Sequence, residues 1–392
     1  MSGIPAATDP EWSLLLAACF APNHKEKNAR IRGLLRSRLR WDVVADLADR
    51  HGVQPLLFQA LSDFKDAVPP EHFNTLVQKY QSNVHKALIL SRELIRIVDS
   101  LSALELEVMP YKGLALAEMV YGDIALRQSG DIDMFVRAGD LPEIRAALEK
   151  LGFTPHLRWS DAKERSYVRS GYEYSFDGSA GRNLLEVQWA IQPRFYAVDF
   201  DMEGMFRRGV VVPVAGHPMK TPSAEDLFIV LSLHAAKHVW GRLIWLCDLA
   251  RLMEKQTLNW DQIGSHAKRL GIQRILRVTL LLAHRILGAS ISSEAEINIP
   301  EDKHAELLAT EIETYIASNT AFDAESFAYF RLMLVLRERR KDQTRFLSRL
   351  IFTAGPGEWD AIRLPEPLFP LYRVVRITRV AAKLVRTTLV RT

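Results

Sequence analysis

The sequence predicts an α+β fold in which a sheet-forming segment lies between two helical regions. Apolar residues recur at helical spacing before residue 106, short apolar runs alternate with helical stretches and turns over 106–220, and helical spacing returns after Thr221. We therefore expect an N-terminal helical region over 1–105, an α/β core over 106–220, and a C-terminal helical domain with a basic amphipathic tail over 221–392.

Composition and charge are those of an ordinary globular protein. The chain has 392 residues, 48% hydrophobic and 25% charged, so it can form two or three domains with large cores. The formal net charge is +4, but residues 371–392 alone carry five Arg and one Lys with no acid. Because the remaining residues are slightly acidic, the basicity is local and is not a broad nucleic-acid footprint.

Cysteine content and the first residues of the chain indicate the compartment. Cys19 and Cys247 have neither metal-binding nor redox spacing, and Asp9 and Glu11 are unlike the cationic start of a signal peptide. No apolar run approaches the roughly 18 residues of a membrane-spanning helix. We expect a cytoplasmic protein without a transmembrane segment.

The first hundred residues are expected to be helical and to carry no chemical cluster. Helices are predicted over 12–20, over 41–61 with breaks at Gly52 and Pro55, and from Pro69 to about residue 104. From Leu106 the pattern changes, and the predicted elements are a strand over 106–111, a helix over 114–121, a strand over 131–137, a helix over 141–151, and strands over 167–176, 183–191 and 210–214.

The strand over 131–137 contains two aspartates. Asp131 and Asp133 share one face, whereas Ile132, Met134 and Val136 share the other. Asp is depleted in strands, and like charges at the rim of a core repel unless a cation or a donor lies between them. A solvated edge strand explains such a pair when it stands alone; a metal site is the functional alternative.

Residues on both sides of this strand favour the functional alternative. Residues 108–113 end in Lys112-Gly113 and precede a helix, and the N-terminus of a helix attracts phosphate. Arg127 and Ser129 supply a cation and a hydroxyl just before the strand. Glu186 lies on one face of a later strand; alone it fits an exposed hairpin, but beside the aspartates it is a natural third ligand.

Helices in the C-terminal region are expected over 227–237, 243–253, 260–269, 272–287 and 331–350, the first after a Ser223 N-cap. His234 and His238 have metal-ligand spacing, but Ala235 replaces the Glu of a zinc motif, so we do not expect zinc. Lys237, Arg242 and Asp248 form either a solvated helix face or part of a site for a triphosphate or base.

The tail, residues 371–392, has the pattern of a basic amphipathic helix. It could lie on an anionic membrane surface or on a partner, or it could dock its apolar face on its own domain. Motifs of P-loop proteins, α/β-hydrolases and dinucleotide-binding folds are absent from the sequence.

Taken together, these motifs resemble the polymerase-β-like nucleotidyltransferase superfamily and, more narrowly, an uncharacterised nucleotidyltransferase family. The resemblance is carried by Lys112-Gly113, Tyr121-Gly122-Asp123, Arg127-x-Ser129-x-Asp131-Ile132-Asp133 and Glu186, and it extends to residues 234–248 and 364–373. Two features depart from the superfamily pattern: Lys112-Gly113 stands where Gly-Gly or Gly-Ser is common, and Glu186 where Asp is frequent.

The resemblance implies a polymerase-β-like mixed sheet with helices, flanked by N-terminal and C-terminal helical regions. It also implies Mg²⁺-dependent or Mn²⁺-dependent transfer of an NMP from an NTP co-substrate, such as ATP, to a hydroxyl or phosphate, with release of pyrophosphate. The catalytic and metal-binding residues would be Asp131, Asp133 and Glu186. The nucleotide-binding residues would be Lys112, Gly113, Arg127, Ser129, Lys237, Arg242 and Asp248.

We expect a small-molecule, peptide or saccharide acceptor rather than nucleic acid. A toxin-like enzyme that modifies RNA and a catalytically idle scaffold that binds a partner are the alternatives. Three further expectations follow: the three carboxylates converge, residues 234–248 face them, and Asp133→Asn abolishes turnover while the melting temperature stays unchanged or rises because repulsion is relieved.

Overall fold

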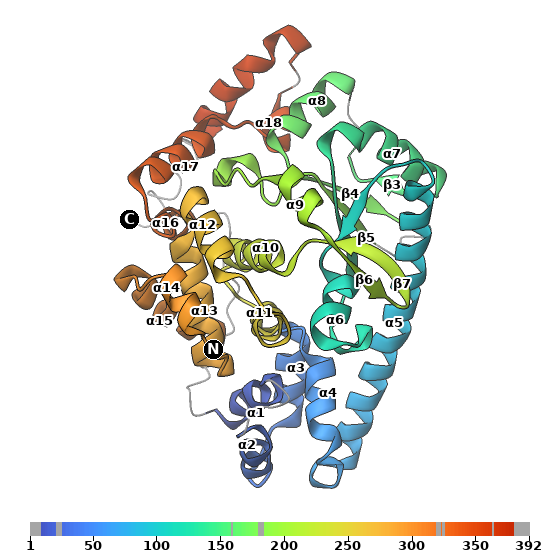
Figure 1. Ribbon diagram of the computed structural model, residues 1–392, viewed down its shortest axis with the longest axis vertical. Helices are drawn as coiled ribbons and strands as arrows, with labels where there is room; N and C mark the ends of the chain where they lie inside the picture. The colour runs from blue at the N-terminus through green and yellow to red at the C-terminus, as the bar shows by residue number, and fades with distance from the viewer. Residues whose placement is uncertain are drawn as a thin grey trace.

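A computed structural model describes residues 9–20, 26–157, 160–178, 184–318, 323, 326–362 and 364–379. Figure 1 shows a mixed sheet with the long helix α5 along one side and a group of C-terminal helices on the other. Within the described residues, no helix combines the length and apolar character needed to cross a membrane.

The sheet has five strands in the order β1-β2-β5-β4-β3. Only β2 and β5 pair in parallel, and the other neighbours are antiparallel, so the sheet is mixed as expected. The strands are β1 (Val108–Pro110), β2 (Asp131–Val136), β3 (Thr154–Pro155), β4 (Glu173–Asp177) and β5 (Leu184–Gln188). A separate hairpin joins β6 (Val210–Val214) to β7 (His217–Thr221).

Alternation along β2 divides the apolar side chains between two cores. Ile132, Met134 and Val136 pack with α5 and α7 in one core, whereas Phe135, on the face of the aspartates, belongs to the larger core of the helical regions. The predicted division of this strand into two faces is therefore confirmed.

The N-terminal helices follow the sequence pattern closely. They are α1 (Pro10–Cys19), α2 (Lys27–Leu34), α3 (Trp41–Arg50), α4 (Gln54–Ser62) and α5 (Pro70–Ser102). The predicted break between α3 and α4 is confirmed: Gly52 has a φ of 70°, a conformation that favours glycine, and Pro55 lies in the first turn of α4.

The middle of the chain contains α6 (Gly113–Tyr121), α7 (Leu141–Lys150), α8 (Asp161–Ser170) and α9 (Met202–Arg208). The strand predicted over 167–176 is wrong in its first half, because residues 161–170 form α8. Gly171 ends this helix, and the strand begins only at Glu173. The sequence analysis also missed β7, whose Pro218 is unusual in a strand.

The C-terminal helices are α10 (Ala224–Lys237), α11 (Leu243–Lys255), α12 (Trp260–Leu270), α13 (Gln273–Leu287), α14 (Ser293–Asn298), α15 (Lys303–Ser318), α16 (Phe327–Val335), α17 (Arg340–Phe352) and α18 (Pro356–Ala361). Ser223 caps α10, since its hydroxyl accepts from the Asp226 N–H. The single helix predicted over 331–350 is two helices, and extended Arg339 between them donates to the carbonyls of Lys268 and Arg269.

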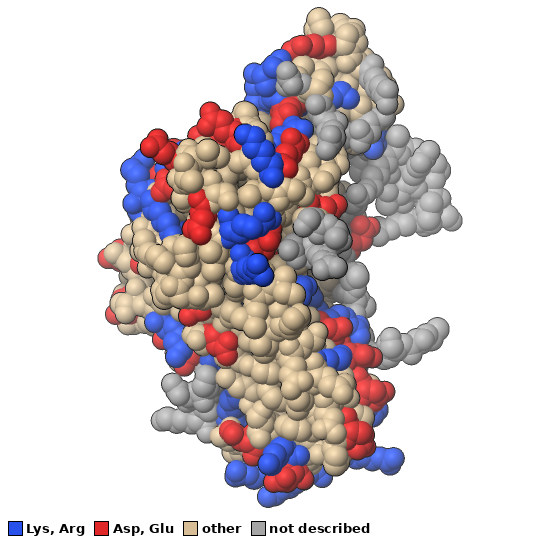
Figure 2. All heavy atoms as spheres, turned by 90° about the vertical axis from the view of Figure 1, so that its right-hand side faces the viewer, with Lys and Arg blue, Asp and Glu red and all other residues tan. Residues whose placement is uncertain are grey.

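The larger core is shared between the two helical regions. Its side chains come from α1, α3 and α4 in the N-terminal region and from α10, α11 and α13 in the C-terminal region. These regions therefore support each other. On the face that carries α5, basic and acidic side chains are interspersed, and neither sign covers a broad area (Figure 2).

The described part of the tail docks on its own chain through polar and aromatic side chains. Tyr372 is buried, and both Arg376 and Arg379 contact the buried Glu358 carboxylate. Val374 and Ile377 are exposed. Val375, from the apolar face of the tail, packs against the core that contains α5 and α7, so part of the described apolar face docks on the domain. Residues 380–392 lie outside the described residues.

Candidate active site

The three predicted carboxylates lie on adjacent strands. Asp133 of β2 is directly opposite Glu186 of β5 in the parallel ladder, a spacing of about 4.8 Å between strands, and Asp131 is two residues earlier on the same face. Burial, Asp133 and Glu173 raise the pKa of Glu186 to about 8. Burial and Asp133 also raise the pKa of Asp131. The carboxylates are therefore close enough to repel one another.

A lysine side chain neutralises part of this charge. The Nζ atom of Lys112 donates to Oδ1 of Asp133 at 2.7 Å, and the two side chains are only 10% and 3% exposed. Burial alone would lower the pKa of Lys112, but Asp133, Tyr111 and Glu186 raise it above its usual value. Lys112 is therefore a charged ammonium at neutral pH.

The turn before α6 depends on a glycine. Gly113 has a φ of 56°, and a Cβ atom there would lie 3.5 Å from the Asp131 carbonyl oxygen and 3.6 Å from Ser129 Oγ. This conformation is strained for residues with a side chain. Among the described residues no side chain caps the N-terminus of α6, which begins beside Ser129 and the Asp131 carbonyl.

Arg127 and Asp248 form a buried clamp between this loop and α11. Arg127 Nε lies 3.0 Å and 3.1 Å from the two carboxylate oxygens, and its NH2 lies 3.0 Å from Oδ2. Tyr121 donates to the same carboxylate at 3.0 Å. The remaining nitrogen, NH1, donates to Ser129 Oγ at 3.3 Å. Asp248 thus pairs with Arg127, and the clamp positions Ser129.

Lys237 links the C-terminal helices to the acidic face of the sheet. It is the last residue of α10, and its Nζ donates to the Tyr172 hydroxyl at 2.8 Å. Burial lowers the pKa of Lys237, while Glu173 and Glu186 oppose this change. The end of α10 therefore faces the acidic side of the sheet, as the sequence analysis expected.

Two other residues of this segment behave differently. His234 faces the cluster, and burial together with Lys112, His238 and Lys237 holds its pKa well below the usual value, so the ring is neutral. Arg242 is exposed, and its Nε donates to the Arg50 carbonyl at 2.9 Å. The described contacts of Arg242 thus tie it to the N-terminal helices rather than to the carboxylates.

The sequence analysis did not assign a role to Gln188 or Tyr111. The Nε2 atom of Gln188 lies 3.4 Å from Asp133 Oδ1, 3.3 Å from Glu186 Oε2 and 3.4 Å from Glu173 Oε2. Its Oε1 accepts from the Tyr111 hydroxyl at 2.7 Å. Alternation along β5 places Gln188 on the face of Glu186, and that signal could have identified it.

Comparison with known proteins identifies the family of the chain. A sequence model of a family described as uncharacterised nucleotidyltransferases matches residues 37–288, more than half of the chain. The chain belongs to this nucleotidyltransferase family. The matched region contains every predicted site residue and ends just after α13. Neither a curated protein nor a solved structure matches the chain.

Family membership supports nucleotidyl transfer from an NTP. It does not bear on metal dependence, which we argue from the chemistry of the side chains. Within the described residues, no group of three or more His, Cys, Asp or Glu side chains is arranged to hold a metal ion. The ligand type nevertheless fits Mg²⁺, which prefers carboxylate oxygens. Burial and, after it, the neighbouring Asp133 carboxylate raise the pKa values of Asp131 and Glu186, and a bound cation would favour the charged form of both groups.

Proposed function

We propose that this nucleotidyltransferase moves an NMP from an NTP to a hydroxyl or phosphate acceptor, releases pyrophosphate, and requires Mg²⁺ or Mn²⁺. One observation carries the proposal. The N-terminus of α6, which no described side chain caps, and the buried Lys112 lie next to the carboxylates of two adjacent strands. N–H groups and Lys112 suit phosphate, whereas the carboxylates suit a cation and a proton.

Binding of the triphosphate would use four groups. The first N–H groups of α6, which begins at Gly113, would meet phosphate oxygens, together with the Lys112 ammonium and the Ser129 hydroxyl. Arg127 would act through its contact with Ser129, because Asp248 already engages its other nitrogens. Lys237 would meet the phosphates from the end of α10, where its Nζ donates to the Tyr172 hydroxyl.

In the chemical step, the acceptor oxygen bonds to the α-phosphorus and the bond to the bridging oxygen breaks. Pyrophosphate leaves with that electron pair, and the acceptor proton passes to the Glu186 carboxylate. Burial and the neighbouring carboxylates raise the pKa of Glu186 to about 8, and a bound cation would lower it, so that the carboxylate form is available to take the proton. Asp131, Asp133 and Glu186 would hold the divalent cation, which when bound supplies positive charge to the phosphates and activates the acceptor oxygen.

The acceptor we propose is a small molecule, peptide or saccharide, and the setting we propose is the cytoplasm. The local charge distribution supports an acceptor other than an extended nucleic acid: residues 371–392 carry five Arg and one Lys with no acid, which exceeds the whole net charge of +4, so the rest of the chain has no basic excess. Which NTP is used stays open, so the test must include all four.

The first experiment measures NTP binding and pyrophosphate release by the full chain with Mg²⁺. We expect binding of at least one NTP by calorimetry, and turnover with a panel of hydroxyl and phosphate acceptors. Asp131→Asn should reduce turnover by about 100-fold or more while keeping the fold. Glu71→Gln, which changes an exposed carboxylate in the first turn of α5, is the matched control and should keep full activity.

The result separates the proposal from an idle scaffold. A scaffold that retained the fold would bind no NTP at millimolar concentration and would release no pyrophosphate. Equal turnover in Asp131→Asn and in the unchanged protein would remove the strand carboxylates from the reaction.

A further inference from the structure

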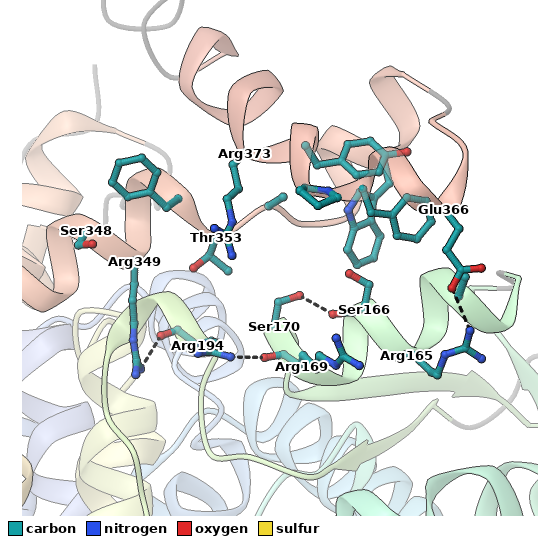
Figure 3. A pocket seen from close by; sticks show the side chains of 17 residues that line it. Arg165, Ser166, Arg169, Ser170, Arg194, Ser348, Arg349, Thr353, Glu366 and Arg373 are labelled. Carbon is teal, nitrogen blue, oxygen red and sulfur yellow. Dashed lines mark hydrogen bonds and ion pairs between the residues drawn. The ribbon is translucent and has the colours of Figure 1, made fainter.

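A pocket of about 820 Å³ lies between α8 and the segment that follows α17 (Figure 3). Among the described residues, five arginines and one acid line it: Arg165, Arg169, Arg194, Arg349, Arg373 and Glu366. In Figure 3, Arg373 extends from the C-terminal segment toward Thr353, with Arg169 and Arg194 on the opposite wall. The pocket contains none of the residues assigned to nucleotidyl transfer.

Several of these guanidinium groups have no carboxylate partner within the described part of the chain. No hydrogen bond or ion pair is formed there by the side chains of Arg169 and Arg373, and Arg194 donates only to the Arg169 carbonyl. Arg349 is different, because it pairs with Asp199. Arg165 pairs with Glu366 at 3.1 Å, but both side chains are exposed, so that pair is weak.

Such an arrangement favours an anion. Like charges gathered in a concave site repel one another, and a bound anion relieves this repulsion. Arginine presents a planar fork of donors that matches two oxygens of one phosphate. Ser166, Ser170 and Thr353 add hydroxyl groups along the wall.

The inner wall of the pocket is aromatic. Trp359 and Tyr372 are each 2% exposed and pack edge to face, with ring centroids 6.4 Å apart. Phe369 packs on Tyr372, and its ring also lines the pocket. A volume of about 820 Å³ with mixed polar and aromatic walls is typical of sites for small molecules.

We propose that this pocket binds a small molecule that carries at least two phosphate groups. The phosphates would contact Arg169, Arg194 and Arg373, and the body of the ligand would lie against the aromatic wall. The concave shape favours a small molecule over RNA, which needs an extended basic groove with stacking platforms. The site is a second anion site, because the NTP phosphates are assigned to α6 and Lys112.

The experiment uses the full chain and fructose 1,6-bisphosphate as the probe in calorimetry at low salt, with unphosphorylated fructose for comparison. The bisphosphate should bind and fructose should not. Arg169→Gln/Arg373→Gln should weaken bisphosphate binding by at least about ten-fold, because two charge-assisted contacts are lost. Neither guanidinium has a partner among the described residues, so the double variant should keep its melting temperature.

Two control variants locate the binding. Arg92→Gln removes an exposed arginine of α5, far along the sequence from the pocket, and should leave bisphosphate affinity unchanged. Asp131→Asn alters the proposed NTP site and should also leave it unchanged. If Asp131→Asn abolishes bisphosphate binding and the double variant does not, the probe occupies the NTP site and the second site is wrong.

Three other outcomes overturn the proposal. The first is no binding of the bisphosphate by the unchanged protein at millimolar concentration. The second is equal affinity in the double variant and the unchanged protein. The third is tight binding of a ten-nucleotide RNA that requires Arg169 and Arg373 while the bisphosphate does not compete, which would make the pocket part of a nucleic-acid surface and would favour the RNA-modifying alternative.

Discussion

At the scale of single residues, the positive charge of Lys112 offsets part of the repulsion between the two aspartates of β2. The sequence indicates that a cation must offset their charge, and a metal ion is one solution. The structure supplies a second one, since the Lys112 ammonium contacts Asp133 at 2.7 Å inside a buried site. The turn residue next to the glycine therefore contributes to the stability of β2 as well as to the proposed binding of phosphate.

This contact changes the expectation for Asp133→Asn. Removal of the carboxylate leaves a buried ammonium without its nearest anion, so we now predict a lower melting temperature rather than an unchanged or higher one. Lys112→Met/Asp133→Asn should recover much of the loss, because both charges are then gone. Thermal unfolding of the single and double variants measures this, and additive losses would contradict the pairing.

Glu186→Gln should raise stability in alkaline solution. The folded-state pKa of Glu186, about 8, lies above its ordinary value of 4.5, so the folded protein keeps a proton that the unfolded chain releases. The stability contributed by this group therefore falls as pH rises between these two values. The variant should melt higher than the unchanged protein near pH 9 and equally near pH 4, and parallel melting curves at all pH values would refute the assigned pKa.

Lys237→Ala should raise the KM for NTP more than it lowers kcat. A phosphate contact made from α10 stabilises the bound substrate and the transition state alike, so its loss weakens binding. Arg242→Ala is the control: its side chain is exposed and bonded to the Arg50 carbonyl, so KM should hardly change. Steady-state kinetics measure both constants. A larger rise in KM for Arg242→Ala than for Lys237→Ala would support the sequence-based prediction that Arg242 binds the nucleotide.

Alternation and spacing predicted much of the site. The shared face of Asp131 and Asp133 follows from the period of a strand, and Gly113 from the turn chemistry. The opposition of Asp133 and Glu186 could not be predicted, because it depends on the pairing of two residues that are 53 positions apart in the chain. The partners of Arg127 and Arg242 likewise depend on tertiary contacts.

At the scale of elements, the Arg127 and Asp248 clamp joins the loop before β2 to α11. Both side chains are nearly inaccessible, and the Tyr121 hydroxyl adds a third element to the contact. The clamp fixes the position of Ser129 relative to the end of α6, so a helix that contributes no direct phosphate contact still shapes the proposed site.

Asp248→Asn should destabilise the protein by about 3–5 kcal/mol, because it leaves the buried Arg127 guanidinium without its counter-charge. Urea unfolding measures the change. Arg127→Met/Asp248→Leu should cost less than the single change, since apolar residues of similar volume can replace a buried ion pair. If Asp248→Asn costs less than about 1 kcal/mol, within the range of an exposed ion pair, the clamp is not a major stabilising contact.

The elements themselves were predicted where one physical signal dominated. The positions of proline and glycine predicted the limits of α3, α4 and α5, and the Ser223 cap predicted the start of α10. The error at residues 167–170 has a local cause: only the second half of the predicted strand alternates, at Tyr172, Tyr174 and Phe176, whereas the mostly polar residues 161–166 favour a helix that runs to Gly171. Sequence periodicity cannot decide between these two signals in so short a segment.

At the scale of the whole molecule, the two cores connect the proposed site to most of the chain. The sheet is covered on one face by α5 and α7, and on the other by the core that unites the N-terminal and C-terminal helices. We predict that a fragment of residues 106–220 alone does not fold cooperatively, because both faces of its sheet would lose their cover. Far-ultraviolet circular dichroism with thermal melting tests this, and a sharp two-state melt would contradict it.

The pocket of five arginines has a practical consequence for anyone who shortens the chain. Arg165, Arg169 and Arg194 belong to the segment that matches the family, whereas Arg349 and Arg373 follow it. A protein trimmed at residue 288 for crystallisation or expression would keep all the residues assigned to nucleotidyl transfer and lose one wall of the pocket. It would also uncover Tyr167, which packs on Trp359, and such a trimmed protein would be prone to self-association through that newly exposed aromatic surface.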